Sequence, residues 1–142
     1  MSAYADTSFL ASLYVLDGNS ALAAARMTRA QLPLLLTPLG ELELTNAVSL
    51  RLFRKELSAS QVKAALTLIR NDLQDGVLMV NALTASAFER AKQIARRQTP
   101  RLGTRTLDVL HVASALVLQA DTFYSFDARQ AKLAAAEGLL VP

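Results

Sequence analysis

The hydrophobic positions of this chain form short apolar runs that alternate with longer stretches of helical spacing. The runs are too brief for helices and are bounded by prolines, glycines or polar residues, which predicts buried strands. They lie at residues 2–5, 34–37, 77–80, 122–126 and 139–141. Strands that alternate with helices predict parallel pairing through right-handed crossovers. We therefore expect an α/β fold with a parallel sheet of about five strands, flanked by helices.

The stretches between these runs predict seven helices, most of them with a capping residue at one end. They cover residues 9–16, 19–33, 38 to about 55, 58 or 60 to about 75, 84 to about 97, 106–119 and 127–137. A loop that carries Pro100 and Gly103 is expected before the sixth helix. In such a fold the carboxyl ends of all strands open on one edge of the sheet, where ligands bind.

The composition narrows the class of protein and of site. A chain of 142 residues with 52% hydrophobic and 19% charged residues predicts one globular domain, here residues 1–142. It has no apolar run long enough for a bilayer and no signal-peptide pattern, so we expect no membrane association and a cytoplasmic location. The absence of cysteine excludes disulfides and thiolate metal sites, and a single histidine argues against a zinc site. The net charge of +3 only weakly favours a polyanionic partner.

Four acids are placed where chemistry is expected. Asp6 ends the first predicted strand, Asp127 follows the fourth, and Asp108 opens a strongly apolar helix. Glu43 lies about one turn inside its helix on a largely apolar face, whereas Glu41 points about 160° away. These positions, Glu43 apart, are strand-to-helix or loop-to-helix junctions on the same predicted edge.

Each acid also has a purely structural explanation. Asp6 and Asp127 can be helix N-caps, and Asp108 suits the first turn of a helix. Glu43 can form an ordinary salt bridge at the rim of the core. His111, one turn after Asp108, can hydrogen-bond to that acid or simply pack in the core, and we favour packing.

Several carboxylates in one small pocket need raised pKa values or a cation between them. No basic residue is placed to pair with all four, so Mg²⁺ or Mn²⁺ is the natural cation. Such an ion bridges to phosphate oxygens, activates a water and stabilises the charge of a phosphodiester under attack.

Residues near these acids are candidates for holding a substrate. Ser125, beside Asp127, is placed to bind a water or ligand. Basic residues cluster ahead of Asp108 in the expected loop, at Arg96, Arg97, Arg101 and Arg105. Such residues neutralise phosphates without reading sequence. Arginines are also ordinary in surface loops, but four without an acid favour function.

The sequence resembles PIN-domain nucleases, and more narrowly the VapC-type toxins of bacterial toxin–antitoxin pairs. The matching segments span nearly the whole chain: Tyr4-Ala-Asp6-Thr-Ser8, Glu41-Leu-Glu43-Leu-Thr-Asn46, Leu107-Asp108-Val-Leu-His-Val-Ala-Ser-Ala115 and Ser125-Phe-Asp127-Ala-Arg-Gln. The resemblance places the four acids of the family on Asp6, Glu43, Asp108 and Asp127, as catalytic and metal-binding residues. The family's hydroxyl after the first acid matches Thr7 or Ser8.

The resemblance implies Mg²⁺- or Mn²⁺-dependent cleavage of RNA. It also implies a homodimer and inhibition by a separately encoded antitoxin. The leading hypothesis is accordingly a metal-dependent endoribonuclease that acts as a toxin. The alternative is a PIN-like module that binds RNA or protein without cutting. A phosphate-transferring protein is disfavoured, because no Gly-rich phosphate loop is present.

Overall fold

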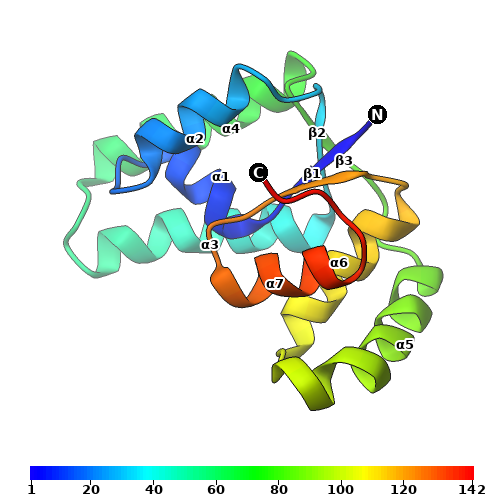
Figure 1. Cartoon of the computed structure of the whole chain (residues 1–142). Helices are drawn as coiled ribbons and strands as arrows, with labels where there is room; N and C mark the ends of the chain where they lie inside the picture. The colour runs from blue at the N-terminus through cyan, green and yellow to red at the C-terminus, as the bar shows by residue number, and fades with distance from the viewer.

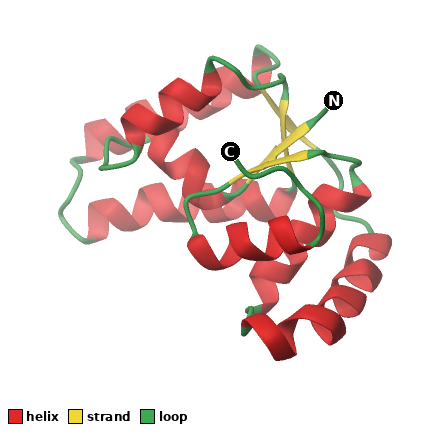
Figure 2. Cartoon of the chain, in the orientation of Figure 1, coloured by secondary structure: helices red, strands yellow, loops and turns green.

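The computed structural model describes residues 1–142 and contains one parallel sheet. Its four short strands are β1 (Ala3–Ala5), β2 (Leu34–Leu36), β3 (Leu78–Val80) and β4 (Thr122–Tyr124). They lie in the order β3-β2-β1-β4, and every neighbouring pair is parallel. Figure 2 shows the strands in yellow among the helices. The expected α/β class and parallel sheet are thus confirmed.

Seven helices connect and flank the strands (Figure 1). They are α1 (Thr7–Tyr14), α2 (Ser20–Met27), α3 (Pro38–Phe53), α4 (Ala59–Gln74), α5 (Ala85–Leu102), α6 (Thr106–Val117) and α7 (Ala128–Ala136). None of them combines the length and the apolar character that crossing a bilayer demands.

Helices cover both faces of the central strands, which is usual for parallel sheets and explains their continuous apolar sequences, whereas Met79 in the edge strand β3 is exposed. Because side chains alternate along a strand, β1 sends Ala3 and Ala5 into one core cluster and Tyr4 into the other. The first cluster is completed by α1 to α4 and the second by α5 to α7. The helices accordingly form two groups on opposite sides of the sheet (Figure 1).

The pairing of β1 with β4 brings together two loops that are far apart in sequence. Ala5 pairs with Tyr124, and the backbone N–H of Asp6 then donates to the Tyr124 carbonyl at 3.0 Å. Asp6 and Ser125 therefore leave the sheet side by side at its carboxyl edge.

Two sequence-based expectations need correction. The run at 139–141 forms no fifth strand, because only Leu140 pairs with the sheet, in a single parallel bridge to Thr122. The expected loop around Pro100 is helical, since α5 continues to Leu102 and ends at Gly103, whose φ is +64°. The arginines assigned to that loop therefore lie on a helix, except Arg105.

Candidate active site

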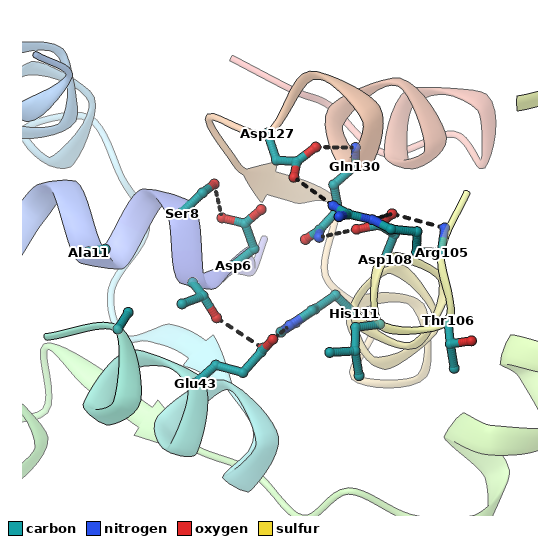
Figure 3. Close-up of a pocket in the computed structure, with 13 residues that line it drawn as sticks. Asp6, Ser8, Ala11, Glu43, Arg105, Thr106, Asp108, His111, Asp127 and Gln130 are labelled. Atoms are coloured by element: carbon teal, nitrogen blue, oxygen red, sulfur yellow. Dashed lines mark hydrogen bonds and ion pairs between the residues drawn. The ribbon is translucent and has the colours of Figure 1, made fainter. Parts of the chain in front are cut away.

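A cavity of about 670 Å³ opens at the carboxyl edge of the sheet, and all four predicted acids line it (Figure 3). The acids come from four elements: the start of α1, the second turn of α3, the first turn of α6 and the start of α7. Only three of the thirteen lining residues are hydrophobic. The pocket is therefore a polar, acidic site.

Asp6 is the most buried of these acids, at 1% exposure. Its Oδ1 accepts from the Phe9 N–H at 2.9 Å and from the Ser8 hydroxyl at 2.6 Å, and its Oδ2 accepts from the Ser125 hydroxyl. Burial raises the pKa of Asp6, and these three donors oppose the rise without cancelling it. A cation nearby would favour the ionised form.

Glu43 lies on the side of the pocket opposite Asp127 (Figure 3). Its Oε1 accepts from the Thr7 hydroxyl at 3.0 Å and contacts Nε2 of His111. Burial pushes the pKa of Glu43 up, but His111 and the Thr7 hydroxyl outweigh it, so the pKa lies below its usual value. No protein group hydrogen-bonds the second oxygen, Oε2.

Asp108 sits in the first turn of α6, where its Oδ2 accepts from the backbone N–H of Arg105 at 3.0 Å. Its Oδ1 accepts from the side-chain amide of Gln130 at 3.1 Å. Burial raises the pKa of Asp108, but these donors and the Arg105 charge more than compensate, and the pKa is lowered.

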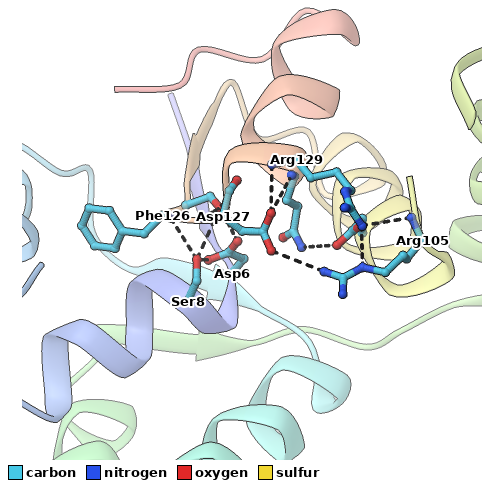
Figure 4. A network of polar contacts seen from close by, with 9 residues as sticks. Asp6, Ser8, Arg105, Phe126, Asp127 and Arg129 are labelled. Atoms are coloured by element: carbon cyan, nitrogen blue, oxygen red, sulfur yellow. Dashed lines mark hydrogen bonds and ion pairs between the residues drawn. The ribbon is translucent and has the colours of Figure 1, made fainter. Parts of the chain in front are cut away.

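Asp127 caps α7, with Oδ1 accepting from the backbone N–H groups of Arg129 and Gln130 at 3.0 and 3.1 Å. Its Oδ2 faces the guanidinium of Arg105 at 3.6 Å, while Nε of the same arginine is 3.4 Å from Asp108 (Figure 4). Arg105 therefore places a positive charge between two of the four acids.

The remaining predicted substrate-binding residues differ in their placement. Thr7 and Ser8 line the pocket, and Ser8 also accepts from the Phe126 N–H at 2.9 Å (Figure 4). Ser125 does not line it, and its hydroxyl is engaged with Asp6 and with the Asp127 N–H.

Of the arginines only Arg105 lines the pocket. Arg96, Arg97 and Arg101 are exposed on α5 outside it, and Arg97 pairs with Glu137.

The oxygen atoms of the four acids are suitable ligands for a hard divalent cation, but the side chains do not lie close together. All four acids offer oxygen, yet no three acidic or histidine side chains stand close enough to hold a metal ion directly. Acceptors that receive no hydrogen bond from the protein include Glu43 Oε2 and the buried Gln130 Oε1. Mg²⁺ binds through one or two carboxylates and keeps several waters, which would supply donors to such acceptors. The residues thus fit a hydrated ion.

The sequence profile of the PIN domain matches residues 3–136. The chain belongs to the PIN-domain family. PIN domains are a family of nucleases that typically use a divalent metal. A search of curated protein sequences finds no significant match.

Solved structures show the same PIN fold at low sequence identity. VapC20 of Mycobacterium tuberculosis, a toxin that cleaves the sarcin–ricin loop, matches with a TM-score of 0.68 at 21% identity over 97% of both chains. FitAcB of Neisseria gonorrhoeae matches with a TM-score of 0.68 at 16% identity, over 98% of this chain and 95% of that one. The resemblance to the PIN-domain and VapC-type families is thereby confirmed at the level of fold.

Two residues of the PIN-domain site contact the acids in ways that the sequence analysis did not predict. His111 is buried, as expected, but it contacts Glu43 and not Asp108. Gln130 binds Asp108 and lines the pocket. The position of Gln130 three residues after Asp127, on the first turn of the same helix, is the signal that could have indicated it.

Proposed function

We propose that this PIN domain is a Mg²⁺- or Mn²⁺-dependent endoribonuclease, the toxin of a toxin–antitoxin pair. The observation that carries the proposal is the convergence of four carboxylates from four separate elements on one polar pocket. Structural caps explain the positions of Asp6 and Asp127 one at a time, but they do not explain why all four acids share a cavity. Membership of a family of nucleases that use a divalent metal explains why the four acids lie together.

Asp6, Glu43, Asp108 and Asp127 are the residues that would hold the ion. When bound, the ion would supply an activated water and neutralise charge on the phosphodiester. The chain itself orients these acids: hydroxyls of Ser8 and Ser125 hold Asp6.

Arg105 is the residue best placed to hold the substrate. Its side chain is 66% exposed and reaches the pocket, so its guanidinium can turn from the carboxylates to a phosphate of RNA. Arg96 and Arg101 lie exposed on α5 and would add non-specific phosphate contacts. Arg97 is a further candidate, but it pairs with the nearly buried Glu137 and would have to leave that carboxylate to contact a phosphate, so we expect it to contribute less.

The toxin assignment rests on the resemblance to VapC-type proteins. VapC20 is a toxin that cleaves the sarcin–ricin loop, and it shares the fold over almost the entire chain. By the same resemblance we propose a separately encoded antitoxin, a homodimer and a cytoplasmic location. The alternative function is a PIN-like module that binds RNA or protein without cleaving it.

A nuclease assay on total cellular RNA tests the activity. Wild-type protein is compared with Asp6→Asn in lanes that contain Mg²⁺, Mn²⁺ or EDTA. Asn retains the helix cap, so the variant should fold. We expect discrete fragments that require metal and decrease at least 100-fold in the variant.

Glu43→Gln and Glu41→Gln form a matched pair on the same helix. Only Glu43 lines the pocket, so its variant should lose cleavage while Glu41→Gln retains it. Binding of RNA without any metal-dependent fragments would favour the non-cleaving module. Cleavage that persists in Asp6→Asn would show that the site is assigned wrongly.

A further inference from the structure

A buried polar chain runs from the sheet to the pocket behind Glu43. Tyr4 in β1 is 0% exposed and His111 in α6 is 2% exposed, yet both carry polar groups. The Tyr4 hydroxyl lies 2.8 Å from Nδ1 of His111, and Nε2 of the same ring contacts Glu43 Oε1. Because buried polar groups are costly unless they are paired, this chain has a structural or functional reason to persist.

The surroundings fix the two rings in place. Tyr4 stacks on Phe123 with ring centroids 5.4 Å apart and meets His111 edge-on at 5.9 Å. On the other side α3 approaches the imidazole at Gly40, where an added Cβ would lie 3.9 Å from its Cε1. The imidazole therefore has little freedom to rotate away from Glu43.

The hydrogen-bonding capacities of the three groups allow one consistent arrangement with a neutral ring. An ionised Glu43 only accepts, so Nε2 must carry the proton of the contact. Nδ1 is then an acceptor, and the Tyr4 O–H is its donor. The Tyr4 hydroxyl thus reinforces the tautomer in which His111 donates to Glu43.

These contacts fix the orientation of the Glu43 carboxylate. Thr7 from α1 and His111 from α6 both bind Oε1, and this leaves Oε2 without a protein partner beside the pocket. We propose that Tyr4 and His111 are positioning residues, which hold Glu43 so that its free oxygen meets the cation or its water. This role rests on the proposed function, in which Glu43 serves the metal.

Nuclear magnetic resonance tests the tautomer without any assignment step, because His111 is the only histidine in the chain. A long-range ¹H–¹⁵N spectrum of the imidazole at pH 8.5 should show one protonated nitrogen, Nε2. In Tyr4→Phe, which removes only the hydroxyl, the signals should shift toward a mixture of tautomers. A wild-type ring with its proton on Nδ1 would overturn the proposal.

Metal binding and kinetics test the effect on Glu43. The variants are His111→Leu, which cannot donate, and His111→Gln, whose amide can replace the Nε2 donor. Loss of such an orienting partner typically lowers metal affinity or activity by 10–100-fold. We expect His111→Leu to lower Mn²⁺ affinity and kcat by about 10-fold or more with the KM for RNA unchanged. His111→Gln should restore most of both.

These readouts separate the two proposals. If wild-type protein cleaves no RNA, the proposed function fails, while the tautomer and the Mn²⁺ affinity still judge the positioning role. If wild-type protein cleaves RNA and folded His111→Leu matches it in kcat and Mn²⁺ affinity, the positioning role is wrong. Should His111→Leu fail to fold, Tyr4→Phe decides, with unchanged tautomer and Mn²⁺ affinity counting against the proposal.

Discussion

At the scale of single residues, Asp6 has two roles with opposite effects on stability. Its carboxylate caps α1 through the Phe9 N–H, which favours the fold, but the charge is buried, which opposes it. Because burial raises the pKa of Asp6, the folded protein holds this proton more tightly than the unfolded chain. The protonated form of Asp6 therefore contributes to the stability of the fold. This contribution is fully present below the unfolded pKa of about 3.9 and is lost as pH rises through the folded pKa.

Asp6→Asn should therefore stabilise the metal-free protein at pH 7. We expect Tm in EDTA to rise, with the gain shrinking toward pH 4. Thermal unfolding across this pH range measures it. Glu43→Gln is the control of opposite sign, since the pKa of Glu43 is lowered and its charge stabilises the fold at neutral pH. A lower Tm for Asp6→Asn at pH 7 would show that its hydrogen bonds outweigh its burial.

Three of the four acids, Asp6, Asp108 and Asp127, could be singled out as candidates from local rules, whereas Glu43 was indicated by its apolar helix face and by the resemblance to PIN-domain nucleases. An acid at a strand end or in the first turn of a helix is visible from a few neighbouring residues. The partner of His111 could not be found in this way. Glu43 lies 68 positions away, and only the tertiary fold, in which α3 approaches His111 at Gly40, brings the two side chains together. Helical spacing indicated an apolar surrounding for His111 and nothing about the hydrogen bond.

At the scale of elements, α5 shows why a local pattern can mislead. A proline inside a helix removes one backbone hydrogen bond and normally marks a boundary. Here α5 continues past Pro100 because its last turns are anchored elsewhere. The buried Gln98 donates to Glu137 at 2.7 Å, and Arg97 pairs with the same carboxylate. These contacts involve the end of α7, about 40 positions away, so no local rule reveals them.

Arg97 and Arg105 should respond differently to replacement by Ala. Arg97→Ala leaves the nearly buried Glu137 with one partner fewer, so Tm should fall by about 2–4 °C, with RNA affinity within two-fold of wild type. Arg105→Ala removes a cation that competes at Asp108 and Asp127. Mn²⁺ should then bind up to about five-fold more tightly, as expected for an exposed ion pair of at most about 1 kcal/mol, while RNA binds more weakly.

Calorimetry with Mn²⁺ and filter binding with RNA measure these effects. Equal losses of RNA affinity in the two variants would show that Arg97 and Arg105 belong to one arginine cluster that binds substrate. Weaker Mn²⁺ binding in Arg105→Ala would mean that the arginine orders the acids and does not compete with the ion.

At the scale of the whole molecule, the fold follows from burial on both faces of the sheet. Short apolar runs between amphipathic helices have few other ways to bury their surfaces, which is why the α/β class was predictable. The carboxyl edge is then the one place where four separate loop–helix junctions converge. The fold therefore gathers charges of like sign into one pocket, and a cation bound there should stabilise the entire chain.

This coupling predicts that Mg²⁺ raises the Tm of wild-type protein. An ion that binds only the folded state adds about 1.4 kcal/mol at ten times its Kd, or about 3–5 °C for a chain of this size. The increment should be larger at pH 8 than at pH 5.5, because the raised pKa of Asp6 lets protons compete with the ion at low pH. Asp6→Asn should start from a higher metal-free Tm and gain little from Mg²⁺. If NaCl at equal ionic strength produced the same increment as Mg²⁺, general screening of the acids would explain the stabilisation, and the pocket would have no specific affinity for the ion.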